Sequence, residues 1–563
     1  MSTDTARTRT DRWGPAPFAF RRAVLVATFG ILVLPGAACG GDDDTGTGDE
    51  PKDGAASPVR GGTLVYGLEN ESSGGWCLPE GQLAISGIQV ARTIYDTLTA
   101  PNADDEYVPF LAESLEPNDD YTEWTVTLRD GVKFHDGSDL TAEVVKNNLD
   151  AYRGKYPARK PLLFRFVLED IASVEVVDDL TLTVTTAVPW PALPAALYGS
   201  GRIGILAQAQ LDDPETCDTR LIGTGPFKLD EWEVNDHLSA SRNPDYWMTD
   251  ADGTRLPYLD RIEYRPIVEE TARMNALESG QLQALHTNDA PTIRAVRSQV
   301  DAGALAQENT DRFSEVSYLM FNTSKAPFDS LTARQAVAKA LNRDEMRSVL
   351  FVDQMKIASG PFAPGVAGYL EDAGFPAYDG EAAAALAEQY EQATGSPLEF
   401  SLSSSSSGET LQITSFIQDQ MAKAGIKVTL DPIEQSQQIS TALGDDWQVQ
   451  YWRNHPGGDP DTQYYWWYGG SPVNFGKFDD PEINALLDEG RSMPDRPERD
   501  KVYQDVNRLF AQKLYSVWTN WSNWTIATSP GVGGVLGPDL PDGSAPFPGL
   551  ATGHPVSGMW MDQ

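Results

Sequence analysis

The segment 124–152 constrains the fold of this chain more than any other. Apolar and polar residues alternate over 124–128, which is the period of a half-buried strand. Asp130-Gly131 favours a tight turn, so 132–134 is interpreted as a return strand. Thr141 then caps a helix with one apolar face, made of Val145, Leu149 and Tyr152. The segment therefore predicts a β-hairpin followed by an amphipathic helix.

Length and charge exclude several classes of partner. With 563 residues, of which 40% are hydrophobic, the chain can form about three to four domains with sizeable cores. Its formal net charge of −39 argues against a surface that neutralises phosphates. The same charge disfavours an anionic membrane surface as a partner. We therefore expect no nucleic-acid partner.

The N-terminus has the pattern of an export signal. Five arginines within residues 1–22 precede an apolar run that ends in small residues before Cys39. A basic region, a short apolar core and small residues at the cleavage site are typical of a signal peptide, here 1–38. The small residues before Cys39 resemble a bacterial lipobox, whose cysteine is lipidated, and simple cleavage near Ala38 is the alternative. Residues 39–60 lack apolar periodicity and are expected to form a flexible tether.

Three motifs together resemble one known family. The sequence L-R-D-G-V-K-F-H-D-G-S-D-L-T-A at 128–142 closely resembles a signature of the family 5 solute-binding proteins, the peptide- and nickel-binding class of ABC importers. The sequence G-T-G-P-F at 223–227 is similar to a second hallmark of that family. The sequence P-F-D-S-L-T-A-R-Q-A-V-A-K-A-L-N-R at 327–343 is similar to a third. The resemblance extends over about residues 60–530.

The resemblance implies an α/β fold with two lobes, the type II, cluster C-like periplasmic-binding-protein fold, with an extra subdomain on the first lobe. The residues agree with an α/β class, because strand, helix and strand patterns follow one another over 398–430. Such a βαβ unit predicts parallel strands. The expected divisions are lobe 1 at 61–95, the extra subdomain at 96–221, lobe 1 again at 222–315, lobe 2 at 316–524 and a return to lobe 1 at 525–563.

Cysteine count predicts one disulfide. If Cys39 is lipidated, Cys77 and Cys217 remain as an even pair in an oxidising compartment. A bridge between them is therefore the first hypothesis, and two buried thiols are the alternative.

A secreted hydrolase is the main alternative class, and it would require catalytic motifs. The chain has no G-x-S-x-G elbow, and none of its five histidines forms H-x-x-x-H or H-E-x-x-H. Cys77 and Cys217 lack the spacing of zinc ligands, and His135, inside the signature, is interpreted as structural. We expect a protein that is not an enzyme and has no cofactor and no metal site. An inert adhesin or scaffold is the third class considered.

The segment 447–468 is the densest in chemically distinctive side chains. Aromatic residues alternate there with polar ones around Gly457-Gly458, a pattern of a loop beside a small organic ligand. It corresponds to the family's W-x-x-D-x-x-D-P segment, which borders the ligand cleft. The ligand-binding residues that we expect are Ser73, Trp76, Asn322, Trp452, Arg453, Asn454, His455 and Asp459.

For the ligand, the family resemblance and the residues of this sequence point in different directions. In the peptide-binding branches of the family, an aspartate of this segment pairs with the α-amine of the peptide. Pro456 stands at that position here, and a proline cannot neutralise an ammonium group. An oligopeptide stays the first hypothesis, an oligosaccharide is the second, and a nickel chelate with His455 is the third.

The family resemblance also implies a cellular location and partners. We expect a monomer, lipid-anchored on the extracytoplasmic face of the membrane, in a periplasmic or cell-surface position. The protein would capture its ligand between two lobes and deliver it to a transmembrane permease pair that cytoplasmic ATPases drive.

Overall fold

A computed structural model describes residues 57–562, apart from 73, 82 and 455–457. The chain divides into two compact units, 1–55 and 56–563, and the second contains the described residues. The predicted signal peptide and Cys39 lie outside those residues. Within the part that the structure describes, no helix has the length and apolarity needed to span a membrane.

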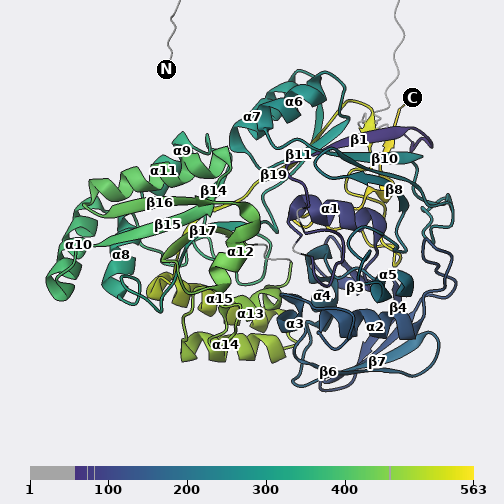
Figure 1. The fold of residues 1–563 in the computed structure, drawn as a ribbon, viewed down its shortest axis with the longest axis horizontal. Helices are drawn as coiled ribbons and strands as arrows, with labels where there is room; N and C mark the ends of the chain where they lie inside the picture. The colour runs from purple at the N-terminus through teal and green to yellow at the C-terminus, as the bar shows by residue number, and fades with distance from the viewer. Residues whose placement is uncertain (1–56, 73, 82, 455–457, 563) are drawn as a thin grey trace, which may run out of the picture. The chain divides into compact units, whose positions relative to one another are not determined.

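A seven-stranded mixed sheet draws its strands from three separate parts of the chain (Figure 1). Its central strand β1 pairs in parallel with β10 and β11, and β19 inserts between β11 and β12. The sheet order is β12 (Ala306–Thr310), β19 (Trp524–Thr528), β11 (Ala284–Thr287), β1 (Thr63–Leu68), β10 (Arg261–Pro266), β9 (His237–Arg242) and β8 (Phe227–Glu233). Its helices are α1 (Ile85–Ile94), α6 (Glu270–Glu278) and α7 (Ala290–Asp301).

A four-stranded antiparallel sheet shares one hydrophobic core with the seven-stranded sheet. Leu64 and Ile262 of the larger sheet belong to the same buried cluster as Val126 and Val184 of the smaller one. We call the two sheets and their helices lobe 1. The smaller sheet has the order β4 (Ala112–Pro117), β5 (Glu123–Leu128), β7 (Thr181–Thr186) and β6 (Ile171–Val176). Its segment also contains β2 (Thr99–Pro101), β3 (Tyr107–Pro109), α2 (Ala142–Tyr152), α3 (Phe164–Val167), α4 (Leu193–Tyr198) and α5 (Gln208–Asp212).

A six-stranded sheet with its own hydrophobic core forms lobe 2. The sheet order is β14 (Lys356–Ile357), β18 (Ser516–Trp521), β13 (Val316–Phe321), β17 (Val449–Asn454), β15 (Glu399–Ser405) and β16 (Lys427–Ile433). The chain enters lobe 2 through residues 311–315 and leaves it through 522–523. Its helices are α8 (Leu331–Ala340), α9 (Arg343–Val349), α10 (Gly380–Thr394), α11 (Gly408–Lys423), α12 (Gln435–Leu443), α13 (Tyr464–Trp467), α14 (Pro481–Ser492) and α15 (Arg496–Lys513). A last pair of short strands, β20 (Val532–Gly533) and β21 (Trp560–Met561), follows β19.

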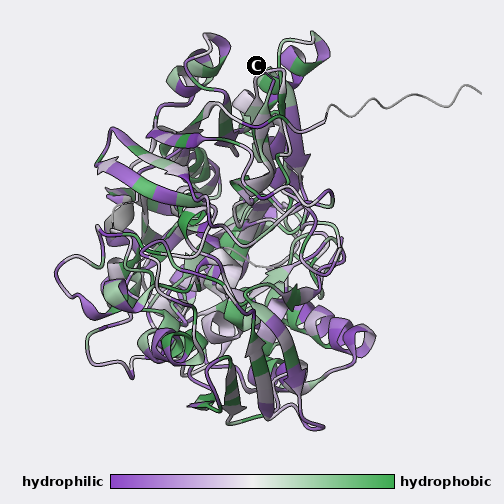
Figure 2. Ribbon diagram, turned by 90° about the vertical axis from the view of Figure 1, so that its right-hand side faces the viewer, coloured by the Kyte–Doolittle hydropathy of each residue, from purple (hydrophilic) through white to green (hydrophobic). Residues whose placement is uncertain are grey.

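The βαβ unit predicted over 398–430 is confirmed. Strands β15 and β16 pair in parallel, and α11 connects them and packs on both. Gly425 ends the connection with a φ of +74°, which glycine adopts without a Cβ clash. Figure 2 shows hydrophilic and hydrophobic residues side by side on the outer helices, as expected for helices that cover a sheet with one face.

The predicted hairpin at 124–134 is only half correct. Strand β5 forms, and Thr141 caps α2 by accepting a hydrogen bond from the Val144 amide. Residues 132–134 do not form a return strand, because both edges of β5 already pair, with β4 on one side and β7 on the other. The apolar residues of that segment are buried in the lobe 1 core instead.

The signature segment and the G-T-G-P segment brace each other through His135. Its Nε2 lies 3.0 Å from the Gly225 carbonyl, and its Nδ1 accepts a hydrogen bond of 3.3 Å from the Gly223 amide. Burial lowers the pKa of His135 to about 4, so the imidazole is neutral and can play both roles. A Cβ on Gly223 would lie 2.0 Å from the Ile94 carbonyl oxygen, so the close approach of α1 requires glycine there.

Cys77 and Cys217 are joined by a disulfide in the structure. Both residues are buried in the lobe 1 core. The bridge links the loop after β1 to the segment before the G-T-G-P motif.

Candidate ligand-binding site

Strand ends from both lobes converge on one region. Glu69 follows β1, Asp289 follows β11, and Glu270 opens the helix after β10, all in lobe 1. From lobe 2, Arg453 lies near the end of β17, and Glu409 lies in the first turn of α11, just after β15. In open α/β sheets, ligands bind beyond the carboxyl ends of the strands. This region is therefore the candidate site.

Arg453 connects the two lobes at this point. Its Nη2 lies 3.5 Å from Glu69 Oε1 in lobe 1. Its Nε lies 3.2 Å from Oε2 of Glu315, which is fully buried in the connection between the lobes. The guanidinium also lies over the Trp524 ring, 5.7 Å from the ring centre. Arg453 thus ties lobe 2 to lobe 1 and to the connection between them.

Carboxylates outnumber guanidiniums in this region, which we call the interlobe charge network. It comprises the acids Glu69, Glu270, Asp289, Glu315 and Glu409 and the bases Arg202, Arg273 and Arg453. Arg273 pairs with Glu270, and Arg202 lies near Glu315 and donates a hydrogen bond to the Leu83 carbonyl. When every group is ionised, the network carries an excess of negative charge.

Burial and mutual repulsion keep several of these acids from ionising easily. The pKa of Glu409 is raised to about 8, first by burial, with Asp289, Glu69 and Glu270 adding to the effect of burial and Arg453 opposing it. The pKa of Glu270 is raised to about 7, again mainly by burial and against the effect of Arg273. Burial also raises the pKa of Glu69. Perturbed carboxyl groups cluster at functional sites, which supports this junction as the candidate site.

Glu409 differs from the other acids because it makes no hydrogen bond or ion pair with any residue that the structure describes. Glu69, Glu270 and Glu315 each contact an arginine, and Asp289 caps α7 by accepting a hydrogen bond from the Thr292 amide. Ser407, and not Glu409, caps α11. Glu409 is therefore the carboxylate that is available to a ligand.

The lobes meet at a second place, which we call the peripheral latch: Asp170 and Trp190 of lobe 1 with Asp461 and Arg491 of lobe 2. The indole N–H of Trp190 donates a 2.7 Å hydrogen bond to Asp461 Oδ2. Arg491 donates from Nε to Asp461 Oδ1 at 2.8 Å and from Nη1 to Asp170 Oδ2 at 2.5 Å. The Arg491 guanidinium also lies over the Tyr464 and Trp190 rings.

The predicted ligand-binding residues are distributed over several environments. Arg453 lies in the interlobe charge network. Asp459 accepts two hydrogen bonds of 2.6 Å from Arg499 and one from the Asp461 amide, so it braces the loop after β17. Asn322 donates a 3.0 Å hydrogen bond to the Trp447 carbonyl, and Asn454 donates one of 2.6 Å to Gln463.

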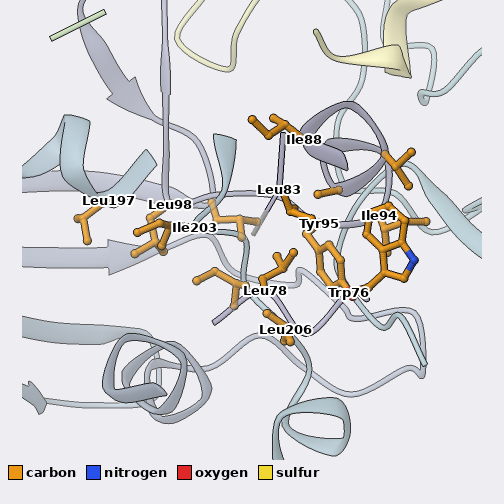
Figure 3. Packing of buried hydrophobic residues seen from close by; sticks show 14 of the residues in the cluster. Trp76, Leu78, Leu83, Ile88, Ile94, Tyr95, Leu98, Leu197, Ile203 and Leu206 are labelled. Carbon is orange, nitrogen blue, oxygen red and sulfur yellow. The ribbon is translucent and has the colours of Figure 1, made fainter. Parts of the chain in front are cut away.

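Of the two predicted aromatic contacts, Trp76 is buried in its lobe and Trp452 is partly buried against the core of the other lobe. Trp76 is 1% exposed and packs in the lobe 1 core, where Figure 3 shows it beside Tyr95 and Ile94. Trp452 packs edge-on against Phe475 in lobe 2. Neighbouring residues of a strand face opposite ways, so Trp452 points away from the face that carries Arg453. Ser73, His455 and Pro456 lie outside the described residues.

Sequence reasoning did not single out Glu69, Glu270, Glu315 or Glu409. With 82 acidic residues in the chain, a single glutamate carries little information. The rule that ligands bind beyond the carboxyl ends of strands would have pointed to two of them. Glu69 directly follows the first strand, and Glu409 follows the predicted strand at 398–402.

Comparisons with known proteins agree with this architecture. Residues 106–475 match the model for the middle part of the bacterial extracellular solute-binding proteins, family 5. The glutathione-binding protein GsiB of Salmonella paratyphi A is 30% identical over 365 residues, which cover 63% of this chain and 67% of that protein.

Solved structures show the same two-lobed fold. The periplasmic binding protein AgaA of A. tumefaciens R10, in complex with agropinic acid, aligns with a TM-score of 0.76 and 27% identity over 89% of this chain and 99% of that one. DppA of Helicobacter pylori, in complex with the peptide STSA, aligns with a TM-score of 0.78 and 20% identity over 90% and 99%. Sequence, fold and the meeting of two lobes at their strand ends lead to one conclusion: this chain belongs to the bacterial extracellular solute-binding proteins, family 5.

Proposed function

We propose that this protein is the substrate-binding component of an ABC importer and takes a small peptide-like ligand between its two lobes. The observation that carries the proposal is the interlobe charge network, where charged groups from both lobes meet at their strand ends. A ligand that contacts both lobes favours the closed arrangement over the open one. The two connections, 311–315 and 522–523, are where a hinge would bend.

The network supports a ligand with a positively charged group. Glu409 has no hydrogen-bond or ion-pair partner among the described residues, and Glu69, Glu270 and Asp289 lie near enough to raise its pKa. A cation between them would reduce that repulsion and pair the partly buried charge of Glu409. The α-amine of a peptide supplies such a cation, and Glu409 could take the role that Pro456 cannot fill.

The ligands of the relatives favour the peptide hypothesis over the oligosaccharide and nickel-chelate hypotheses. GsiB is named for binding glutathione, and the DppA and AgaA structures hold a peptide and agropinic acid. Nickel–histidine complexes are bound by NikZ of Campylobacter jejuni and NikA of Staphylococcus aureus, which are 19% and 20% identical to this chain and show the fold alone. Among the described residues, no group of three or more metal-ligating side chains is placed to hold an ion.

The remaining parts of the function follow from family membership. We infer delivery to a transmembrane permease coupled to cytoplasmic ATPases, without chemical conversion of the ligand. Lipidation of Cys39 would hold the protein at the extracytoplasmic face of the membrane, and a monomer is the simplest form for this role.

A thermal-shift panel tests the ligand class. The panel contains trialanine, N-acetyl-trialanine, glutathione, maltotriose and nickel–histidine, because a ligand that binds only the folded protein raises its melting temperature. We expect trialanine to raise it and N-acetyl-trialanine, which lacks the amine, to have a much smaller effect. A response to maltotriose or nickel–histidine alone would replace the peptide hypothesis, and no response to any compound would contradict the proposed function.

A variant pair locates the ligand. Glu409→Gln keeps the shape of the side chain and removes its charge, and we expect it to weaken trialanine binding by about tenfold or more, as for the loss of a charged hydrogen bond. Glu388→Gln is the matched control, because Glu388 is exposed on α10 in the same lobe. Equal loss in both variants, or none in Glu409→Gln, would place the ligand elsewhere.

A further inference from the structure

The peripheral latch joins the lobes through side chains other than those of the candidate site. Asp170 directly precedes β6, and Trp190 follows β7, both beside the four-stranded sheet of lobe 1. Asp461 lies in a short 3-10 helix, and Arg491 lies near the end of α14, both in lobe 2. None of the four is a member of the interlobe charge network.

Each polar group of the latch is paired across the boundary between the lobes. Trp190 reaches Asp461 from lobe 1, and Arg491 reaches Asp170 from lobe 2. The side chains are largely withdrawn from solvent, with 6% of Arg491, 2% of Asp461 and 24% of Asp170 exposed. Charged hydrogen bonds with this geometry and burial are among the stronger ones in proteins.

Neighbouring contacts extend the same boundary. Arg496 at the start of α15 donates a 3.0 Å hydrogen bond to the Asp105 carbonyl of lobe 1. The Gly458 amide donates to the Tyr107 hydroxyl at 3.1 Å. A Cβ on Gly458 would lie 1.9 Å from Asp105 Oδ1, so any other residue there would have to displace the Asp105 side chain.

Separation of the lobes would break all of these contacts across the boundary together. Arg491 would lose Asp170 and the face of Trp190, while it would keep Asp461, which belongs to its own lobe. Asp461 would lose the indole N–H and retain the guanidinium. The lobe 2 half is therefore already formed before closure and needs only the two lobe 1 side chains to complete it.

We propose that Asp170 and Trp190 are positioning residues that hold the two lobes closed from outside the ligand site and so set ligand affinity without touching the ligand. The inference rests on the proposed function only for its effect on affinity. A ligand binds the closed arrangement, so its apparent affinity falls with the fraction of protein that can close. The latch acts on that fraction.

The decisive test measures the distance between the lobes with and without a probe. Spin labels at Glu116→Cys in lobe 1 and Glu388→Cys in lobe 2, both exposed positions, report that distance. We compare the wild type with Asp170→Ala, Trp190→Phe and the double variant, in the absence and presence of trialanine. We expect the double variant to shift the distance distribution toward longer values in at least one of the two conditions.

A matched control separates the contact from the charge. Glu169→Ala removes the same charge next to Asp170, from an exposed side chain that makes no hydrogen bond or ion pair with any described residue. We expect Asp170→Ala to weaken trialanine binding by about tenfold and to accelerate its release, as for the loss of a charged hydrogen bond, with Glu169→Ala close to the wild type.

The outcomes are distinguishable. An unchanged distance distribution in the double variant, with and without trialanine, would overturn the latch. A lower melting temperature with unchanged distances and unchanged affinity would show a merely structural role and would also overturn it. If trialanine binds neither the wild type nor any variant, the peptide hypothesis is contradicted, and the distances measured without the probe still decide on the latch.

Discussion

The two regions where the lobes meet differ in how completely their charged groups are paired. In the peripheral latch, the carboxylates of Asp170 and Asp461 share one guanidinium, that of Arg491, and the indole of Trp190 adds a further donor. In the interlobe charge network, Glu409 has no hydrogen-bond or ion-pair partner among the described residues, and burial raises the pKa of three acids. The contact that only joins the lobes satisfies its own polar groups, while the candidate binding region keeps one carboxylate unsatisfied for a ligand.

Removal of Arg491 should have the largest effect. Arg491→Met leaves Asp461, which is 2% exposed, without its guanidinium and also breaks the contact with Asp170. Loss of one partner of a buried ion pair costs about 3–5 kcal/mol of folding stability. Urea unfolding of the variant measures this loss. A stability within about 1 kcal/mol of the wild type would show that the latch is a surface contact.

Removal of Arg453 should reduce folding stability somewhat less than removal of Arg491. Arg453→Met leaves Glu69 and Glu315 without their guanidinium, but 27% of the Arg453 side chain is exposed, so solvent reduces the penalty to about 2–4 kcal/mol. The control is Arg347→Met, whose ion pairs lie on the surface and should contribute about 0–1 kcal/mol. Equal effects of Arg453→Met and Arg347→Met would remove the distinction between the network and an ordinary surface.

Glu409→Gln should change stability in the opposite direction. The pKa of Glu409 rises from 4.5 to about 8 on folding, so the folded protein binds more protons than the unfolded one between these values. Ionisation of Glu409 therefore costs no folding stability near pH 4 and costs most above about pH 8. Above about pH 8, Glu409→Gln should be more stable than the wild type by about 1–2 kcal/mol. Melting temperatures at pH 5 and pH 9 check this. A destabilised variant at pH 9 would mean that Glu409 has a partner in the ligand-free protein.

The smallest effect should be a release of protons on ligand binding. A cationic ligand beside Glu409 and Glu270 lowers their pKa values, which are about 8 and about 7 without it. At pH 7.5 we expect a fraction of one proton to leave when trialanine binds. Calorimetric titrations in buffers with different ionisation enthalpies measure that number. Proton uptake in place of release would contradict a cation at this position.

Local signals in the sequence predicted the elements that depend on local structure. The alternation at 398–430 and the capping residue Thr141 led to a confirmed βαβ unit and a confirmed helix start. The return strand at 132–134 failed because hairpin signals at Asp130-Gly131 say nothing of β4 and β7, which occupy both edges of β5. Pairing partners distant in the chain decide such cases.

The candidate site was predictable only in part, for a related reason. Arg453 was found because it lies in a segment that resembles the family's ligand loop. Glu409 was missed because a glutamate in the first turn of a helix is ordinary, and its significance comes from Glu69, Glu270 and Asp289, which belong to the other lobe. A residue whose role depends on the other lobe leaves no pattern in its own neighbourhood.

The position of β19 has a consequence for the order in which the protein acquires its structure. Strand β19 lies between β11 and β12, so the sheet of lobe 1 lacks an internal strand until residues 524–528 are present. The sheet of lobe 2 also waits for a late strand, because β18, at residues 516–521, lies between β14 and β13. Loop closure over long sequence separations is slow, so both sheets should be completed late, after the ribosome has made most of each lobe. An emerging chain therefore carries an open sheet edge at β11 and depends on its last tenth to close it.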